Sequence, residues 1–128
     1  MRKILLALVP MIGIGAAHAK TTDADFQLKT AQNLYNLCTT NNGNPARERA
    51  VYLCVGYIEG ALDLYQTLVR IGRLVPKTCL PAAVTRIQVA RIFIAWGKAN
   101  PGRLTQAAMD GLGEAAQSRW PCPPTKRK

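Results

Sequence analysis

Apolar side chains recur with helical spacing in several stretches of the chain, the longest of which covers residues 44–72. Asn44 and Pro45 are residue types that favour the start of a helix, and Gly72 favours its left-handed end. Apolar residues occupy an arc of roughly 200° on this predicted helix, about twice the width of the apolar face of an ordinary surface helix. The pattern therefore predicts one long central helix that other elements contact from nearly every side.

Three shorter helices are predicted around it. Residues 30–38 carry apolar side chains on one face and begin with Thr30 as the N-cap, and residues 85–100 begin with a capping box formed by Thr85 and Gln88. The last predicted helix spans about residues 105–120, whereas residues 20–29 are polar and are expected to be extended. Because no stretch of useful length alternates apolar and polar residues, the chain is predicted to be all-α, a small bundle of four helices.

The first 19 residues have the layout of a secretory signal peptide. Arg2 and Lys3 precede an apolar run over residues 4–17, and Ala17-His18-Ala19 supplies the small residues of a cleavage site. A membrane anchor is the alternative, but the run is shorter than the roughly 20 apolar residues of a span and is interrupted by Pro10. We expect cleavage after residue 19, which leaves a helical domain at residues 20–122 and a basic tail at residues 123–128.

Export changes the interpretation of the four cysteines, because an even number of cysteines in a short exported chain favours structural disulfides. No C-x-x-C pair is present, so a redox motif or a zinc site is poorly supported. A turn at residues 39–44 can return the chain so that Cys54 comes level with Cys38, and a bridge between them would contribute about 3 kcal/mol. Cys79 and Cys122 then remain as the second pair.

The chain is strongly basic, with a formal net charge of +10 that becomes +8 (15 basic minus 7 acidic residues) when the signal peptide is removed. Nucleic acid is the usual partner of such a protein, but the sequence shows export and no basic stripe interleaved with aromatic residues. Scattered solvated charge is therefore the favoured interpretation, and attraction to an anionic envelope surface or an acidic protein is the alternative.

Few residues are suited to catalysis. The only histidine, His18, leaves with the signal peptide, and the only serine, Ser118, has no nucleophile motif around it. Glu59 and Asp63 stand one helical turn apart but have no third ligand nearby in the sequence, so neither a metal site nor a cofactor is predicted. The same two acids disfavour a membrane span within residues 44–72. We expect a protein that binds a partner, not an enzyme.

Several segments of the chain together form a pattern, and its most specific part is C-x-G-Y-I-x-G-x-x-D at residues 54–63. The other parts are Phe26, residues 30–38, residues 79–81, residues 84–88 and the Trp-Pro-Cys at residues 120–122. With this pattern the chain resembles the Rap/Tai family of type VI secretion immunity proteins. This resemblance implies an all-helical periplasmic protein, commonly a homodimer, that neutralises a peptidoglycan-cleaving amidase by covering its active cleft.

The resemblance also implies roles for individual residues. A scaffold role is implied for Cys38, Cys54, Cys79, Cys122, Gly56, Tyr57, Gly60 and Asp63. Gly56 and Gly60 are expected where a second backbone comes close, and the wide apolar arc of residues 44–72 is expected to be shared with a dimer mate. Contacts with the toxin are expected in loops that vary among members, and the candidates here are Arg70, Arg73, Lys77 and Arg103.

Two other functions fit an exported helical protein without catalytic residues. One is a periplasmic acid-stress chaperone, which would expose apolar surface at low pH, although this chain has no histidine after cleavage and few carboxylates through which acid could act. The other is a non-catalytic envelope-associated protein, and the basic tail is the only feature of the sequence that supports it. Both rank below the immunity function.

Overall fold

The computed structural model describes residues 21–124, so the predicted signal peptide, Lys20 and tail residues 125–128 lie outside the described part. The elements in chain order are η1 (Asp23–Gln27), α1 (Ala31–Cys38), α2 (Arg47–Arg70), α3 (Arg86–Ala99), η2 (Pro101–Arg103) and α4 (Ala108–Arg119). Pairing of the β type is limited, over this part, to the isolated bridges Thr30–Ala107 and Thr78–Pro121. The predicted all-α fold with four helices is confirmed.

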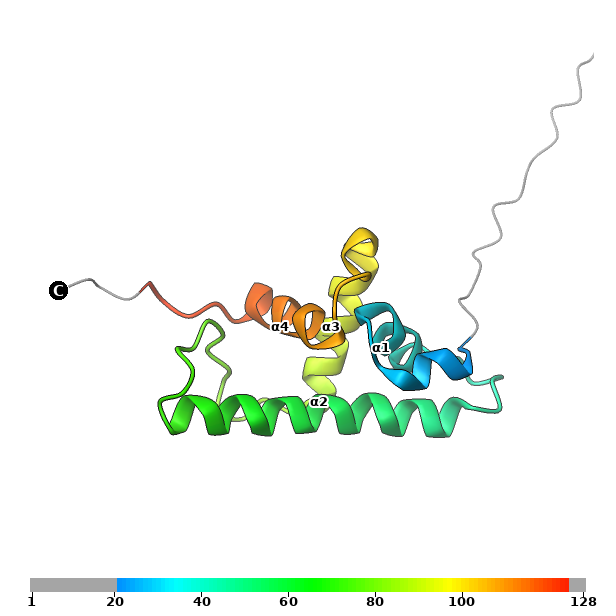
Figure 1. Cartoon of the computed structure of the whole chain (residues 1–128), viewed down its shortest axis with the longest axis horizontal. Helices are drawn as coiled ribbons and strands as arrows, with labels where there is room; N and C mark the ends of the chain where they lie inside the picture. The colour runs from blue at the N-terminus through cyan, green and yellow to red at the C-terminus, as the bar shows by residue number, and fades with distance from the viewer. Residues whose placement is uncertain (1–20, 125–128) are drawn as a thin grey trace, which may run out of the picture.

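The long helix α2 forms the base of the molecule, and α1, α3 and α4 lie on one side of it (Figure 1). Its 24 residues extend for about 36 Å. Helices α1 and α3 pack on α2, while α4 packs mainly on α1 and α3. The largest fully buried side chains come from three of the helices and meet between them: Leu34, Leu37, Ile58, Val89 and Phe93.

The starts of two helices were predicted correctly, and that of α2 was not. Thr30 and Thr85 each accept a hydrogen bond from the backbone three residues ahead and form capping boxes. Helix α2, however, begins at Arg47 instead of next to Asn44. The Asn44 side chain accepts a hydrogen bond from the Ala46 N–H at 2.8 Å, and this local turn delays the helix. Gly72 has φ 70°, the left-handed conformation expected of it.

The expectation of an extended segment at residues 20–29 is wrong for the described residues. Residues 23–27 form the 3₁₀ helix η1, because Asp25 is buried and its carboxylate accepts hydrogen bonds from Thr22, Asn33 and Asn36. Helix α4 also starts at Ala108, later than the predicted residue 105. The residues before it pair with the start of α1, where the Ala31 N–H donates to the Gln106 carbonyl at 2.8 Å.

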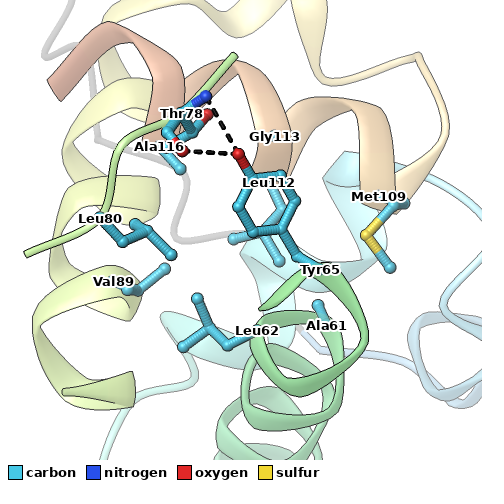
Figure 2. A pocket seen from close by; sticks show the side chains of 10 residues that line it. All are labelled: Ala61, Leu62, Tyr65, Thr78, Leu80, Val89, Met109, Leu112, Gly113 and Ala116. Atoms are coloured by element: carbon cyan, nitrogen blue, oxygen red, sulfur yellow. Dashed lines mark hydrogen bonds between the residues drawn. The ribbon is translucent and has the colours of Figure 1, made fainter. Parts of the chain in front are cut away.

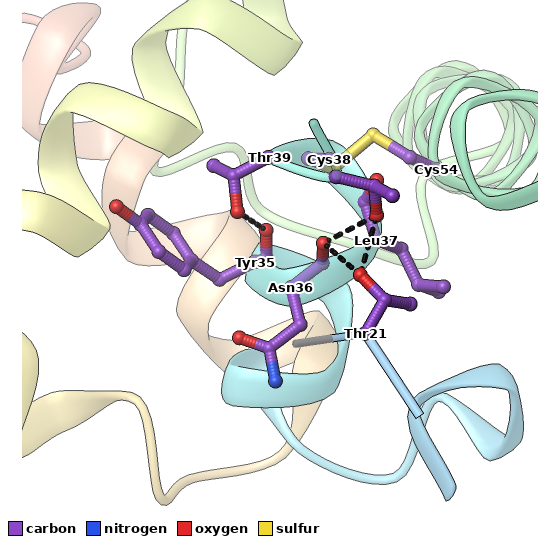
Figure 3. The surroundings of a disulfide bond; sticks show 8 residues. Thr21, Tyr35, Asn36, Leu37, Cys38, Thr39 and Cys54 are labelled. Atoms are coloured by element: carbon purple, nitrogen blue, oxygen red, sulfur yellow. Dashed lines mark hydrogen bonds between the residues drawn. A yellow bond between two sulfur atoms is a disulfide. The ribbon is translucent and has the colours of Figure 1, made fainter. Parts of the chain in front are cut away.

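Both disulfides have the predicted pairing. Cys38 at the end of α1 is bonded to Cys54 within α2, and their Cα atoms are 5.2 Å apart. Figure 3 shows this bridge beside Thr21 and Asn36. The Thr40 hydroxyl donates to the Asn36 carbonyl at 2.8 Å, and the Thr21 and Thr40 hydroxyls share a buried hydrogen bond at 2.6 Å. The α1–α2 hairpin is thus fastened at its closed end by a covalent bond and by buried hydrogen bonds.

Only part of the apolar surface of α2 is covered by the rest of this chain. Ala50, Cys54 and Ile58 are buried, whereas Tyr52 is 71% exposed and Leu64 is 54% exposed. The described residues therefore cover one side of this helix, and the expectation that a dimer mate covers more of its apolar arc stays a prediction. None of the helices in this part of the chain has the length and apolarity required to cross a bilayer.

Within the described residues the close approaches at glycine occur at Gly97 and Gly111, and the expected approach of a second chain at Gly56 and Gly60 stays a prediction. Gly56 and Gly60 are exposed, and a Cβ added to either would meet no described atom within 4 Å. A Cβ on Gly97 would instead lie 2.6 Å from the Tyr35 ring, and one on Gly111 would lie 2.6 Å from the Ala31 Cβ. The two latter glycines allow α1 to pack against α3 and α4, whereas Gly56 and Gly60 leave a bare strip on the outer face of α2.

Candidate functional site

Three of the four predicted partner-binding cations lie together in residues 70–78, hereafter the basic segment. It leaves the end of α2 and rises beside the C-terminal end of the described chain (Figure 1). Arg70, Arg73 and Lys77 are exposed, and none of them forms an ion pair with a described acidic residue. The basic segment therefore presents three cations with no charged partner among residues 21–124.

Apolar side chains are exposed within the same segment. Leu74 is 39% exposed and Val75 is 78% exposed, and Ile71 at the start of the turn is 54% exposed. The backbone N–H groups of Arg73 and Leu74 both donate to the Leu68 carbonyl. These hydrogen bonds hold the N-terminal part of the segment on α2. Exposed aliphatic residues flanked by cations are a composition suited to contact with another protein.

The far end of the basic segment is held on the body of the molecule. The Cys79 N–H donates to the Trp120 carbonyl at 2.9 Å, and the Cys122 N–H donates to the Lys77 carbonyl at 3.2 Å. The Cys79–Cys122 disulfide reinforces this contact, with Cα atoms 4.8 Å apart. In addition, the Tyr65 hydroxyl donates to the Thr78 carbonyl and accepts from the Thr78 N–H, as Figure 2 shows.

A small apolar cavity lies beneath this end of the segment. Its volume is about 80 Å³, and it opens between α2, α3, α4 and residues 78–80. The lining side chains visible in Figure 2 come mainly from aliphatic and small residues: Ala61, Leu62, Leu80, Val89, Met109, Leu112 and Ala116. Helix α4 packs on α1 and α3 and makes little contact with α2. The cavity lies in the space that this arrangement leaves between α4 and α2.

Arg103, the fourth predicted cation, lies on η2 and not in the basic segment. Its guanidinium binds the Glu114 carboxylate of α4, and this hydrogen bond lowers the pKa of Glu114 and raises the pKa of Arg103. Glu114 also lines the groove that contains Lys77 and Asp110. The predicted cations are therefore on neighbouring surfaces, but Arg103 is engaged within the chain and Lys77 is not.

The predicted scaffold residues other than the cysteines occupy the surface or the edge of the core. Tyr57 is half-buried against the core, and its burial, with the nearby Asp110 carboxylate, raises the pKa of its hydroxyl. Asp63 is exposed, and its neighbour Glu59 forms a two-pronged ion pair with Arg86 at 2.5 and 2.6 Å. Within residues 21–124 no group of histidine, cysteine or acidic side chains is arranged to hold a metal ion.

Sequence reasoning missed Tyr65 as part of this site. Tyr65 belongs to the apolar arc of the helix predicted at residues 44–72, yet its hydroxyl reaches 13 residues along the chain to the backbone of Thr78. The one signal in the sequence was the hydroxyl of a tyrosine predicted to face the core, because a buried tyrosine hydroxyl needs a hydrogen-bond partner. The exposed Met109, which lines the groove next to Lys77, was also missed.

The comparison with protein families decides the assignment. The family model described as Rap1a immunity proteins matches residues 30–122, which include all four helices and all four cysteines. The chain belongs to the Rap1a immunity protein family. Members of this family are generally non-catalytic, and membership indicates an immunity protein directed against a type VI effector. The matched region contains the entire basic segment.

No curated protein and no solved structure matches the chain. The family match begins at the N-cap of α1 and ends at the last cysteine, so η1 and Asp25 lie outside it. The predicted resemblance to the Rap/Tai immunity proteins is confirmed at the level of the family.

Proposed function

We propose that this protein is a periplasmic immunity protein that binds a peptidoglycan amidase delivered by type VI secretion and neutralises it by covering its active cleft. The observation that carries the proposal is the Rap1a family match over residues 30–122. Two disulfides support export to an oxidising compartment, in which such a bond persists. In this compartment an amidase delivered by a neighbouring cell would reach its substrate.

The basic segment is the proposed contact with the amidase. Arg70, Arg73 and Lys77 lack partners within the described chain, so their charges are available to an acidic surface. Opposite charge accelerates association, and exposed aliphatic residues such as Val75 can enter a cleft and exclude water from it. Arg103 is proposed as a contact at the edge, because its pairing with Glu114 leaves it less free.

We further propose that the protein is a homodimer joined through the outer face of α2. This face combines the exposed Tyr52 with the open sites at Gly56 and Gly60, where another backbone can approach closely. Replacing Gly60 with leucine fills that strip without a described neighbour to displace. Sedimentation is expected to give a dimer for the native protein and a monomer for Gly60→Leu, whereas a native monomer would refute the dimer.

Co-expression tests the proposed function. The genes beside that of this protein are searched for a peptidoglycan amidase, and the enzyme so found is directed to the periplasm of a test bacterium, with and without the immunity protein. Cells that make the amidase alone are expected to lyse, and cells that make both proteins are expected to grow. Lysis in the presence of a correctly exported and folded immunity protein would contradict the proposal.

A matched control separates inhibition of one amidase from protection of the cell against cell-wall hydrolases in general. The same cells are challenged with an unrelated periplasmic cell-wall hydrolase, against which no protection is expected. An acid-stress chaperone would instead suppress aggregation of unfolded clients at about pH 2 and would leave the amidase active at neutral pH. Protection against both hydrolases would therefore contradict the proposed mechanism of covering one active cleft.

A further inference from the structure

We propose that Tyr65 is a positioning residue, which holds the basic segment in the conformation that meets the partner. The inference rests on the proposed function only for the identity of that partner. Tyr65 lies on α2 and is half-buried. Its hydroxyl forms hydrogen bonds with both backbone polar groups of Thr78, at 2.5 Å to the carbonyl and 3.2 Å to the N–H. Figure 2 shows the hydroxyl directed at this residue from below.

The segment has few other supports at this end. Residues 75–77 are exposed. Among residues 21–124, the backbone of residues 74–77 forms hydrogen bonds to the rest of the molecule only at its two ends, through the Leu74 N–H and the Lys77 carbonyl. Packing beneath Thr78 is incomplete, because the cavity of about 80 Å³ lies under it. A segment that does not rest on a filled core must take its position from directional bonds.

Two connections to different elements, hereafter the two ties, therefore meet at residues 78–79. The Cys79–Cys122 disulfide connects the segment to the chain after α4, and the Tyr65 hydroxyl connects it to α2. Thr78 itself is 9% exposed, so removal of the hydroxyl leaves two buried backbone groups without that partner. Lys77, the cation next to Thr78, is consequently placed at the rim of the groove that contains Asp110.

Pre-organisation of this kind raises affinity without any contact between Tyr65 and the partner. If the segment is competent for binding only while both contacts hold, the apparent dissociation constant equals the intrinsic one divided by the competent fraction, and it increases as that fraction falls. The association rate is expected to fall, because fewer molecules present Arg73 and Lys77 in the right place at each encounter.

The test compares Tyr65→Phe with Tyr57→Phe in the oxidised protein of residues 20–128. Both variants remove one hydroxyl from α2, but the Tyr57 hydroxyl forms no hydrogen bond with another residue in the described range. Amide hydrogen exchange is measured at Thr78 and Cys122, with Phe93 in the core as the reference. We expect exchange at Thr78 and Cys122 to be about tenfold faster in Tyr65→Phe, which corresponds to about 1.4 kcal/mol, and unchanged in Tyr57→Phe.

Two results of this exchange comparison would overturn the inference. One is native exchange at Thr78 in Tyr65→Phe, and the other is an equal acceleration at Phe93, which would indicate general destabilisation. A further arm uses Cys79→Ser/Cys122→Ser as the background, where loss of the Tyr65 hydroxyl is expected to have a larger effect on exchange because the second tie is gone. Equal effects in the two backgrounds would also count against shared control of the segment.

Binding to the amidase effector provides the functional arm. Tyr65→Phe is expected to associate several-fold more slowly than the native protein, while Tyr57→Phe associates at the native rate. A native association rate for Tyr65→Phe would refute a positioning role in binding. If the native protein itself fails to bind the amidase, the proposed function is wrong, but the exchange measurement still decides whether Tyr65 holds the segment.

Discussion

Cys79 and Cys122 are separated by 43 residues, yet their Cα atoms lie 4.8 Å apart. The bond closes a loop that contains α3, η2 and α4, and it joins Cys79, directly after the basic segment, to Cys122, which lies shortly after the end of α4. The other disulfide, between Cys38 and Cys54, closes only the α1–α2 hairpin. The two disulfides therefore stabilise different parts of the molecule. Cys79–Cys122 lies near the proposed binding surface, and Cys38–Cys54 lies at the closed end of the α1–α2 hairpin.

Replacement of Cys79 and Cys122 with serine is expected to lower the free energy of unfolding by about 4 kcal/mol, against about 3 kcal/mol for serine at Cys38 and Cys54. The chain-entropy model gives this order because a loop of 43 residues restricts the unfolded chain more than a loop of 16. Urea unfolding of both double variants measures the difference. A larger loss for the Cys38–Cys54 variant would show that native contacts, and not loop length, dominate.

Replacement of Asp25 with alanine is expected to destabilise the protein by about 1–3 kcal/mol at pH 7. Its carboxylate accepts from the Asn33 and Asn36 side chains at 3.1 and 2.9 Å, and these amides lose a buried partner in the variant. Asp23→Ala is the control, because the Asp23 side chain is fully exposed and reaches Arg49 only at 3.6 Å. Equal effects of the two changes in urea unfolding would contradict the structural role of Asp25.

The contribution of Asp25 is expected to depend on pH. Burial alone would raise the pKa of Asp25, but the hydrogen bonds from Thr22, Asn33 and Asn36 outweigh it and hold the pKa below its ordinary value. A carboxyl group with a lowered pKa stabilises the fold above the unfolded pKa, near 4, and loses this contribution as the pH falls through the folded pKa. The stability difference between native protein and Asp25→Ala is thus expected to be constant from pH 5 to 7 and to shrink below pH 4.

Two glycines on α4 offer a matched test of close packing. A Cβ on Gly111 would lie 2.6 Å from the Ala31 Cβ, whereas one on Gly113 would meet nothing within 4 Å. We expect Gly111→Ala to destabilise the protein by about 1–3 kcal/mol through overpacking, and Gly113→Ala to stabilise it by up to about 1 kcal/mol through helix propensity. Thermal unfolding of the two variants checks the signs, and equal signs would contradict the packing of α1 on α4.

Local signals in the sequence predicted much of the fold. Thr30 and Thr85 mark helix starts by means of partners three residues away, and Cys38 and Cys54 follow from the length of the turn between two helices. The start of α2 was misplaced because Asn44 bonds to the Ala46 N–H within its own turn, which its residue type does not distinguish from a helix cap.

The parts that sequence could not predict depend on contacts between distant segments. The helix η1 forms because Asp25 meets Asn33 and Asn36 on α1, and Gly97 is required because the Tyr35 ring occupies the adjacent space. The same holds for the candidate site, where the cations of the basic segment were predicted but the Tyr65 contact with Thr78 was not. The spacing and composition around one residue of such a pair do not indicate which distant residue it will contact.

The most direct test of the account is titration of the purified amidase with the native protein while peptidoglycan hydrolysis is measured. We predict complete inhibition at a stoichiometric ratio, and an inhibitory concentration at least about tenfold higher for Arg73→Glu/Lys77→Glu, because reversed charges at the interface repel an acidic partner. The control Arg91→Glu/Lys98→Glu makes the same charge change on exposed residues of α3 and is expected to inhibit like the native protein. Undiminished hydrolysis in the presence of excess native protein would contradict the account.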